Sequence, residues 1–507
     1  MKANIIRKLS VIDYRVVYMR RIGIVASGST VLDAGVILAE GEEKNVKAED
    51  LVLIDNRNGN RIMAVTRGGL GSNENLRTSN YSPGVAYARV GRHPSNAKEF
   101  YAFGLSVVGE VSDSKLIENK MLIAPSSEVE IFEEHDNPMR ILGSTENIIG
   151  YYKYHPNWKV PTNPDFICYH MGVFAATGAG KSLLTRYEII PFIKKAGYKV
   201  LIFDWKGSDY APYFSCKYEL SDIGLEDDVV VDYLSSAMDD FGYFIGSYAE
   251  RNPIRSSLET VIYDGKWRNI EDPEKLRSYL EAKVTKEIGS DCLDSSGNVN
   301  QYGQRNIRKF KKHLSKLNVE KLRNVQGRAT TAEILEALKQ HDVVVIDLGL
   351  GSKSEKLSIF LSIAKYLNER MENKEQLDLA VVIDEGPQYC PFMPKGIETK
   401  TMEVISELCA LGRSYNLSVI LLSQGIAGEI GINAAIRRNL NTQFIGKLNP
   451  LDLDEAMRLL GQSDIDSKYL VLMPVGDFYV TGKMNASPIP LLIHFDLPEQ
   501  TAEGDTT

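Results

Sequence analysis

The residues best suited to chemistry lie in the segment AATGAGKS, at positions 175–182. It follows a strand-like apolar run and precedes a helix-like segment, which is the setting that a phosphate-binding loop requires. Gly178 and Gly180 let the backbone curl so that its N–H groups point at phosphate oxygens, and the helix start adds partial positive charge. Lys181 would reach the β- and γ-phosphates, and the Ser182 hydroxyl would bind magnesium. We therefore predict a site for ATP and Mg²⁺ formed by Thr177, Gly178, Ala179, Gly180, Lys181 and Ser182.

Two adjacent acids, Asp384 and Glu385, follow a second apolar run, in the segment LAVVIDEGP. The strand ends of a parallel sheet face the ligand crevice, so we expect both carboxylates near the phosphate loop. Asp384 would hold magnesium through water, and Glu385 would activate the water that attacks the γ-phosphate. The alternative interpretation is an acid pair that caps a helix. The position of the pair 203 residues after Lys181 (384 − 181) favours the catalytic interpretation.

These side chains need a scaffold that brings distant strand ends together. From about residue 165 onward, helix-like segments alternate with near-continuous apolar runs, which are typical of strands buried on both faces. We therefore predict a parallel, doubly wound sheet. The apolar runs occupy residues 171–175, 198–203, 343–348, 379–384, 417–423 and 443–448.

Two other regions have a different character. Residues 1–145 contain short β-branched and aromatic runs, and Asn58-Gly59 between two of them predicts a hairpin in a small barrel or sandwich. Residues 225–335 are polar and helix-prone, and we interpret them as a helical insertion in the ATPase domain. One apolar helical stripe in that insertion consists of Ile307, Phe310, Leu314 and Leu317.

The charge of the chain is unevenly distributed. Its 507 residues carry a net charge of −8, whereas residues 305–328 hold nine Lys or Arg and one acid, Glu320. This basic stretch is either a surface for DNA or a partner, or a solvated helix face. No segment approaches the roughly 18 apolar residues of a membrane helix, and the five cysteines form no C-x-x-C pair, so we expect a cytoplasmic protein.

Several further segments match a family pattern. CYHMGVFAATGAGKS (168–182), LIFDWKGSDY (201–210) and LCALGRSYNLSVILLSQ (408–424) resemble segments of the HerA-type ATPases, which are hexameric DNA translocases related to FtsK. The resemblance implies an α/β fold with a RecA-like core and a parallel sheet, preceded by a small HAS-type β-barrel. The implied domains are the barrel at 1–145, the ATPase core at 146–224 and 336–496, the helical insertion at 225–335 and a disordered tail at 497–507.

The resemblance also implies roles for three further side chains. Asp204 would lie near the catalytic magnesium or water, Arg413 would be an arginine sensor or finger, and Gln424 would sense the γ-phosphate. Each side chain also has a simpler interpretation from the residues alone. Asp204 could cap a helix, Arg413 could form a surface ion pair, and Gln424 could be the last residue of a strand without a catalytic role.

The expected partners follow from the same resemblance. We expect a homo-hexamer that acts on double-stranded DNA as a translocase or helicase, together with a separate nuclease or other effector chain docked on the barrel, in DNA end processing or anti-phage defence. The alternatives are an ATPase ring that scaffolds a partner effector and a DNA-packaging ATPase. Many family members have an arginine at the position of Tyr169 that acts on the neighbouring subunit, so Arg437 or Arg438 is the candidate substitute here.

Overall fold

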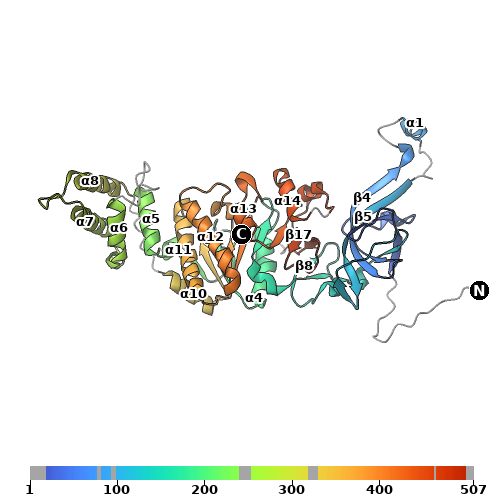
Figure 1. Ribbon diagram of the computed structural model, residues 1–507, viewed down its shortest axis with the longest axis horizontal. Helices are drawn as coiled ribbons and strands as arrows, with labels where there is room; N and C mark the ends of the chain where they lie inside the picture. Colours follow the sequence, from blue (N-terminus) through green and yellow to red (C-terminus); the bar gives the residue numbers. More distant parts are fainter. Residues whose placement is uncertain are drawn as a thin grey trace, which may run out of the picture. The chain divides into compact units, whose positions relative to one another are not determined.

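The chain divides into two compact units (Figure 1). The barrel unit comprises residues 1–162, 460–469 and 486–494, and the ATPase unit comprises residues 163–459, 470–485 and 495–507. Three segments that we expected in the ATPase core, residues 146–162, 460–469 and 486–494, therefore fall in the barrel unit. The computed structural model describes residues 19–76, 81–92, 99–238, 253–317, 329–461 and 464–497. Most of the predicted tail and part of the basic stretch lie outside these ranges.

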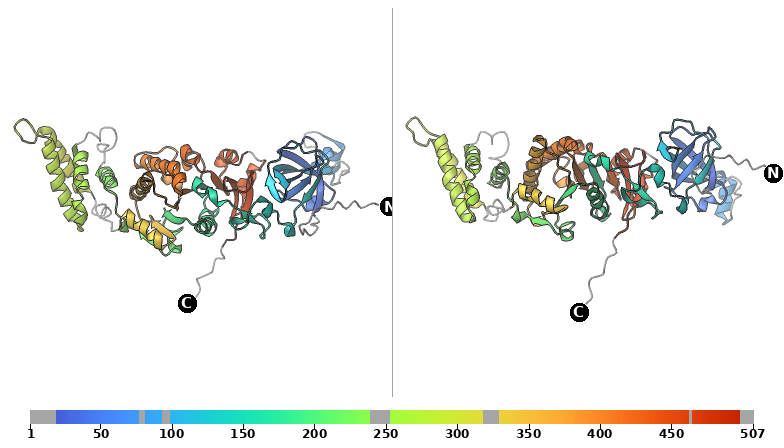
Figure 2. Two further views of the ribbon diagram at one scale, coloured as in Figure 1. Left: turned by 60° about the horizontal axis from the view of Figure 1, so that its bottom comes forward. Right: turned by 90° about the horizontal axis from the view of Figure 1, so that it is seen from below.

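Antiparallel strands close into a barrel at the start of the described chain (Figure 2). Its strands are β1 (Arg20–Val25), β2 (Asp33–Leu38), β3 (Leu51–Asp55), β4 (Arg61–Asn73), β5 (Glu99–Ser112) and β7 (Glu128–Ile131), and β6 (Lys115–Ile117) extends β5. Pairing in the order β2-β1-β7-β3-β4-β5 is closed by β2 against β5, around buried side chains such as Ile22, Ile54 and Val129. The predicted barrel is thus confirmed.

The predicted hairpin joins β3 to β4. Leu51 pairs with Val65 and Asp55 with Arg61, and the Gly59 N–H donates to the Asn56 carbonyl at 2.8 Å. Gly59 has a φ of 108°, a left-handed conformation that side chains rarely adopt. The hairpin is therefore where we predicted it, but its loop (residues 56–60) is longer than a two-residue turn, and Gly59 rather than Asn58 has the positive φ.

The ATPase unit is built on a mainly parallel sheet. Its strands are β10 (Met171–Phe174), β11 (Lys199–Asp204), β12 (Lys217–Glu219), β13 (Val343–Asp347), β14 (Leu379–Ile383), β15 (Leu417–Ser423), β16 (Thr442–Ile445) and β17 (Asp477–Gly482). They lie in the order β12-β13-β11-β14-β15-β10-β16-β17, and β17 is antiparallel to β16. Every residue of β10, β14 and β15 is buried, which explains why their sequences are continuously apolar.

Helices connect and cover these strands. They include α3 (Lys181–Leu184), α4 (Ile190–Lys195), α10 (Thr331–Gln340), α11 (Lys353–Glu372), α12 (Ile397–Gly412), α13 (Ala434–Arg437), α14 (Leu453–Leu459) and α15 (Ser467–Leu472). A π-helical turn over Thr185–Ile189 joins α3 to α4 into one helical segment. Pro191 follows this turn and lacks an N–H donor, which accounts for the irregular hydrogen bonding there.

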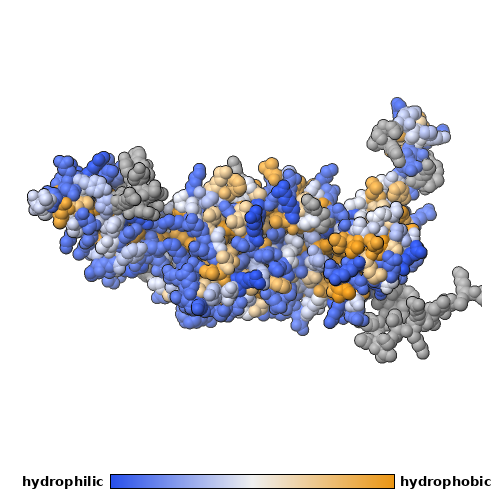
Figure 3. Space-filling model, in the orientation of Figure 1, coloured by the Kyte–Doolittle hydropathy of each residue, from blue (hydrophilic) through white to orange (hydrophobic). Residues whose placement is uncertain are grey.

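The insertion between β12 and β13 is helical where it is described. It contains α5 (Asp227–Met238), α6 (Pro253–Tyr263), α7 (Pro273–Asp291) and α8 (Gln301–Lys316). Phe310 and Leu314 of the predicted stripe are fully buried, and hydrophilic residues cover most of the visible face of α7 and α8 (Figure 3). The chain enters and leaves the insertion at one place, since Ile223 and Ala329 form a parallel bridge.

The other described α-helices and strands belong to the barrel unit. They are α1 (Pro83–Arg89), α2 (Met139–Leu142), β8 (Ile148–Tyr152), β9 (Lys159–Pro161) and β18 (Leu491–His494). The buried Arg67 guanidinium pairs with Glu49 at 3.1 Å and donates to the Pro490 carbonyl at 2.7 Å. Within the described ranges, no helix has the length and apolarity needed to cross a membrane.

Candidate nucleotide-binding site

The phosphate loop lies between β10 and the helix that begins at Lys181. Gly178 and Gly180 have φ angles of 77° and 99°, in the left-handed region that glycine adopts without strain. The Lys181 ammonium donates hydrogen bonds to the carbonyl oxygens of Ala175 at 2.6 Å and Ala176 at 3.3 Å. Burial lowers the pKa of Lys181. The loop thus has the curved backbone that phosphate binding requires, and the Lys181 side chain folds over it to contact its first residues.

The loop forms one wall of a cavity of about 240 Å³. The residues from the sequence analysis that line this cavity are Thr177, Gly178, Gly180, Lys181, Ser182, Asp384, Glu385 and Gln424. They meet because Phe174 pairs with Ser423, and Ile383 with Leu421, in neighbouring parallel strands. The carboxyl ends of β10, β14 and β15 therefore lie at one edge of the sheet. Ala179 is buried and does not line the cavity.

A hydrogen-bonded chain connects the phosphate loop to the proposed general base. The Thr177 hydroxyl donates to Gln424 Oε1 at 2.8 Å, and Gln424 Nε2 donates to both carboxylate oxygens of Glu385 at 2.7 and 2.9 Å. The Lys206 ammonium also contacts Glu385, at 2.5 Å. Glu385 has a φ of 53°, a left-handed conformation that is strained for a residue with a side chain. Its carboxylate is therefore held in one orientation.

Asp384 is buried beside this chain. Its Oδ2 atom has no hydrogen-bond partner among the described residues, and its side chain is 2% exposed. Burial, and then the neighbouring carboxylates of Glu385, Asp209 and Asp204, raise the pKa of Asp384 to about 7. A bound cation would strongly stabilise the ionised carboxylate of Asp384, because its charge would offset both the cost of burial and the repulsion from the neighbouring carboxylates.

The arrangement fits a magnesium ion bound together with phosphate. Mg²⁺ usually takes one or two carboxylates, a hydroxyl, water and substrate phosphates rather than an all-protein cage. The described residues contain no cluster of three or more His, Cys, Asp or Glu that could hold a metal alone. The unpartnered oxygen of Asp384 and the Ser182 hydroxyl, both at the cavity, are the ligands that the chain would contribute.

Asp204 lies at the end of β11 but does not line the cavity. Its Oδ1 accepts the Gly207 N–H at 3.0 Å, and its Oδ2 accepts the N–H groups of Tyr210 at 2.8 Å and Ala211 at 2.9 Å. The carboxylate is fully buried. In this structure Asp204 shapes the turn after β11, and a role near the metal or water stays a prediction.

Arg413 also lies away from the cavity in its own chain. It follows α12 and precedes β15, whereas Gln424 directly follows the other end of β15. A seven-residue strand spans about 20 Å, so Arg413 cannot act as a sensor on the nucleotide of its own subunit. Its guanidinium lies 4.0 Å from the centre of the Tyr169 ring. A role on a neighbouring subunit stays a prediction.

The structure adds Lys206, Asp209 and Arg186 to the cavity wall. Lys206 contacts Glu385, and Arg186 Nη1 donates to the Asp209 carbonyl at 3.0 Å. The interaction with Glu385 raises the pKa of Lys206, although burial acts in the opposite direction. Lys206 and Asp209 follow a buried parallel strand in the sequence, and this is the same signal that identified Asp384. Lys206 is thus a site residue that we did not predict, although it lies only two residues after Asp204.

One family model and several solved structures are similar to parts of this chain. Residues 147–367 match the family model described as the central domain of helicase HerA. No curated protein matches the sequence. Among solved structures, VirB4 of Thermoanaerobacter pseudethanolicus is 14% identical, with a TM-score of 0.48, and the match covers 69% of this chain and 96% of that chain.

Two other solved structures are similar at comparable levels of identity. The bacterial conjugative coupling protein TrwBΔN70 is 13% identical with a TM-score of 0.46, covering 72% of this chain and 92% of that chain. The genome packaging NTPase B204 of Sulfolobus turreted icosahedral virus 2, in complex with ATP-γ-S, is 12% identical with a TM-score of 0.33. That match covers 66% of this chain and 100% of the viral protein.

The family match covers the phosphate loop, the turn after β11 and the insertion, and the acidic pair lies just beyond it. A curled phosphate loop, a positioned glutamate and an unpartnered buried aspartate converge on one cavity in the same unit. The site thus has the residues and the geometry of a P-loop ATPase, residues 147–367 match the central domain of helicase HerA, and a β-barrel precedes this region in the chain.

Proposed function

We propose that the chain is an ATP-driven translocase or helicase that moves double-stranded DNA as a homo-hexamer. The observation that carries the proposal is the hydrogen-bonded chain from Thr177 through Gln424 to Glu385. It joins the phosphate loop, the end of β15 and the proposed general base. Loss of the γ-phosphate at the loop would therefore change the hydrogen bonds of Gln424 at the end of β15. A motor needs such a connection, because hydrolysis must be coupled to movement.

The described residues suggest how one turnover proceeds. Lys181 and the loop N–H groups would bind the β- and γ-phosphates, and Ser182 and Asp384 would hold Mg²⁺, which neutralises phosphate charge. Phosphate entering the cavity would compete with Glu385 for the Lys206 ammonium. Glu385, still oriented by Gln424, would then accept a proton from the attacking water.

The assembly and the partners belong to the same proposal. In a ring, Arg413 would lie at a subunit boundary and stabilise charge on the neighbouring nucleotide. The barrel would dock a separate nuclease or other effector, in DNA end processing or anti-phage defence. Exposed basic residues of α8 are a candidate DNA-facing surface, although Lys311 already pairs with Glu281 at 3.1 Å.

The decisive experiment measures the ATPase rate of the purified chain with and without double-stranded DNA ends, at two salt concentrations. A DNA translocase should be stimulated by DNA, and the stimulation should fall with salt. A slow ATPase rate that does not change with DNA and rises only when a protein partner is added would instead support an ATPase ring that scaffolds a partner effector.

A substitution tests the general base in the same assay. Glu385→Gln keeps the shape and the position of the side chain but removes the proton acceptor, so turnover should fall by at least about a hundredfold while ATP still binds. Glu336→Gln, in an exposed pair with Lys339, is the matched control and should leave the rate unchanged. Unimpaired turnover in Glu385→Gln would show that another group activates the water.

A further inference from the structure

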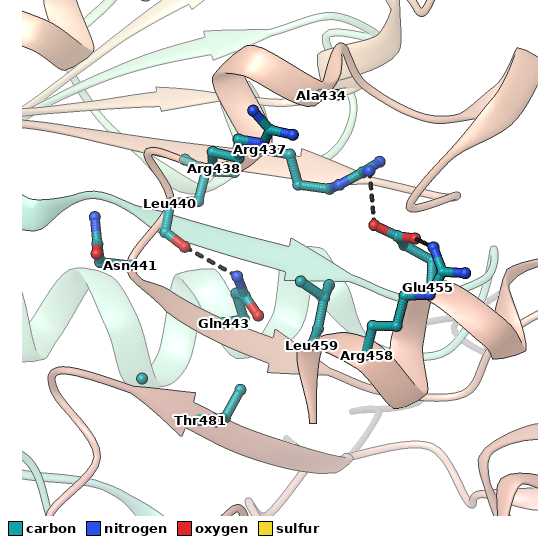
Figure 4. Close-up of a pocket in the computed structure, with 11 residues that line it drawn as sticks. Ala434, Arg437, Arg438, Leu440, Asn441, Gln443, Glu455, Arg458, Leu459 and Thr481 are labelled. Atoms are coloured by element: carbon teal, nitrogen blue, oxygen red, sulfur yellow. Dashed lines mark hydrogen bonds and ion pairs between the residues drawn. The ribbon is translucent and has the colours of Figure 1, made fainter. Parts of the chain in front are cut away.

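A second cavity in the ATPase unit has a different chemical character from the nucleotide site. It has a volume of about 540 Å³ and lies between α13, α14 and the strands β16 and β17 (Figure 4). Its wall contains three arginines, Arg437, Arg438 and Arg458, and one acid, Glu455. These four side chains sum to a charge of +2 (3 − 1) in a chain whose net charge is −8.

The arginines differ in how firmly they are held. Arg437 donates to the Ile426 carbonyl and to Glu455, both at 2.7 Å, and Arg458 contacts the second oxygen of Glu455 at 3.3 Å. Glu455 thus orients two guanidinium groups and neutralises only one of them. Arg438 is exposed, and its guanidinium has no acceptor among the described residues; Figure 4 shows it pointing away from Glu455. Two positive charges therefore remain for a ligand.

The rest of the wall favours phosphate over a nucleoside. Gln443 and Thr481 are cross-strand partners on β16 and β17, and they add polar groups to the floor. None of the described residues that line the cavity is aromatic, so a base would find no ring to stack on. Arginine guanidinium groups match the geometry of phosphate oxygens through paired N–H donors.

The positive charge continues beyond the cavity. Lys483 follows β17, and its N–H donates to the carbonyl of Asn441 in the cavity wall at 3.0 Å. The Lys483 ammonium lies 5.0 Å from the centre of the Tyr169 ring. The basic surface is thus longer than one phosphate group, which favours a ligand with phosphates in series.

We propose that this basic cavity, together with Lys483, binds successive phosphates of a nucleic-acid strand without reading its bases. This inference rests on the proposed function, since it identifies where the ATPase contacts DNA. The same phosphate chemistry could be supplied by a nucleotide bound to a second copy of the chain, and the experiment must separate the two sources.

The test measures binding of a fluorescently labelled DNA duplex by anisotropy at several salt concentrations, with the full chain. Arg438→Gln combined with Arg458→Gln removes two phosphate contacts. The slope of log K against log salt should then fall by about 1.8, and affinity at 0.1 M salt should fall about 60-fold. The control pair Lys266→Gln and Lys339→Gln removes two exposed charges elsewhere and should change neither quantity. Arg438→Lys with Arg458→Lys should retain the slope.

Each outcome decides the matter. A slope that falls by about 1.8 in the Gln pair, and not in the control pair or the Lys pair, supports the proposal. An unchanged slope overturns it, and if basal ATPase falls as well, the arginines act on a nucleotide of a neighbouring copy. If the Gln pair melts early, Arg438→Gln alone replaces it, because the Arg438 guanidinium has no acceptor among the described residues; its slope should fall by about 0.9, and an unchanged slope overturns the proposal. Absence of DNA binding by the unaltered chain would refute the proposed function itself.

Discussion

The buried Asp384 carboxylate makes a sharp prediction about stability. In the metal-free protein, burial and neighbouring acids raise its pKa to about 7 from an ordinary value of 3.8. Between these pH values the folded protein holds a proton that the unfolded chain has released. Stability therefore falls as the pH rises through this interval, and it stays reduced above pH 7.

The size of the effect follows from the two pKa values. Each tenfold change in proton affinity corresponds to about 1.4 kcal/mol, so a difference of about three gives about 4 kcal/mol above pH 7. Asp384→Asn has nearly the same shape and carries no charge, so it should escape this penalty. At about 2 °C for each kcal/mol, the melting temperature of Asp384→Asn should exceed that of the natural protein by about 8 °C at pH 8. At pH 5 only part of this interval has been crossed, which costs about 1.6 kcal/mol, so the excess in melting temperature should shrink to about 3 °C.

The measurement is thermal unfolding of both proteins at pH 5 and pH 8 in the presence of a chelator. Asp342→Asn is the matched control, because that exposed carboxylate pairs with Lys194 and Lys199, which lower its pKa. The control should not raise the melting temperature at pH 8. If Asp384→Asn gains no more than Asp342→Asn, the carboxylate is not under the electrostatic stress that the geometry implies, and the magnesium assignment loses its support.

Two further predictions concern the hydrogen-bonded chain and the barrel. Gln424→Ala should lower kcat on the order of a hundredfold, since Glu385 loses the side chain that orients it, and it should change the KM for ATP much less. A comparable fall in ATP affinity would contradict a positioning role for Gln424. Arg67→Met should destabilise the barrel unit by about 3–5 kcal/mol, because the buried Glu49 carboxylate loses its guanidinium partner, whereas Arg67→Met combined with Glu49→Leu should recover most of that loss in a melting experiment.

The parts of the site that the sequence predicts are those with a local cause. The phosphate loop is one continuous segment whose glycines have the left-handed angles that its pattern requires. Asp384 and Glu385 could be placed beside it because parallel strands end at a common edge. The fold class followed similarly from continuous apolar runs, such as β14 and β15, which are buried throughout.

The parts that escaped prediction depend on where a side chain finds its partners. Asp204 stands at a strand end like Asp384, yet its oxygens accept backbone N–H groups of its own turn. Arg413 and Gln424 lie eleven positions apart (424 − 413), but a strand between them puts them at opposite edges of the sheet. The link between Lys206 and Glu385 joins two separate strand ends, which spacing in the sequence does not encode.

The bridge between Ile223 and Ala329 affects how well the fold tolerates changes in the length of the helical insertion. Hydrogen bonds from the Gly224 N–H to Ala329 (2.8 Å) and from the Ala329 N–H to Asp222 (2.7 Å) hold the two ends of the insertion together. A segment of about 100 residues thus leaves and rejoins the core at one point, so its length adds little to the entropy of closing that loop. Helix α5 also contacts the core, through Asp228 with Lys365 and Asp232 with Lys400, so α6, α7 and α8 are the part of the insertion whose length we expect to vary while the strands that carry the nucleotide site keep their register.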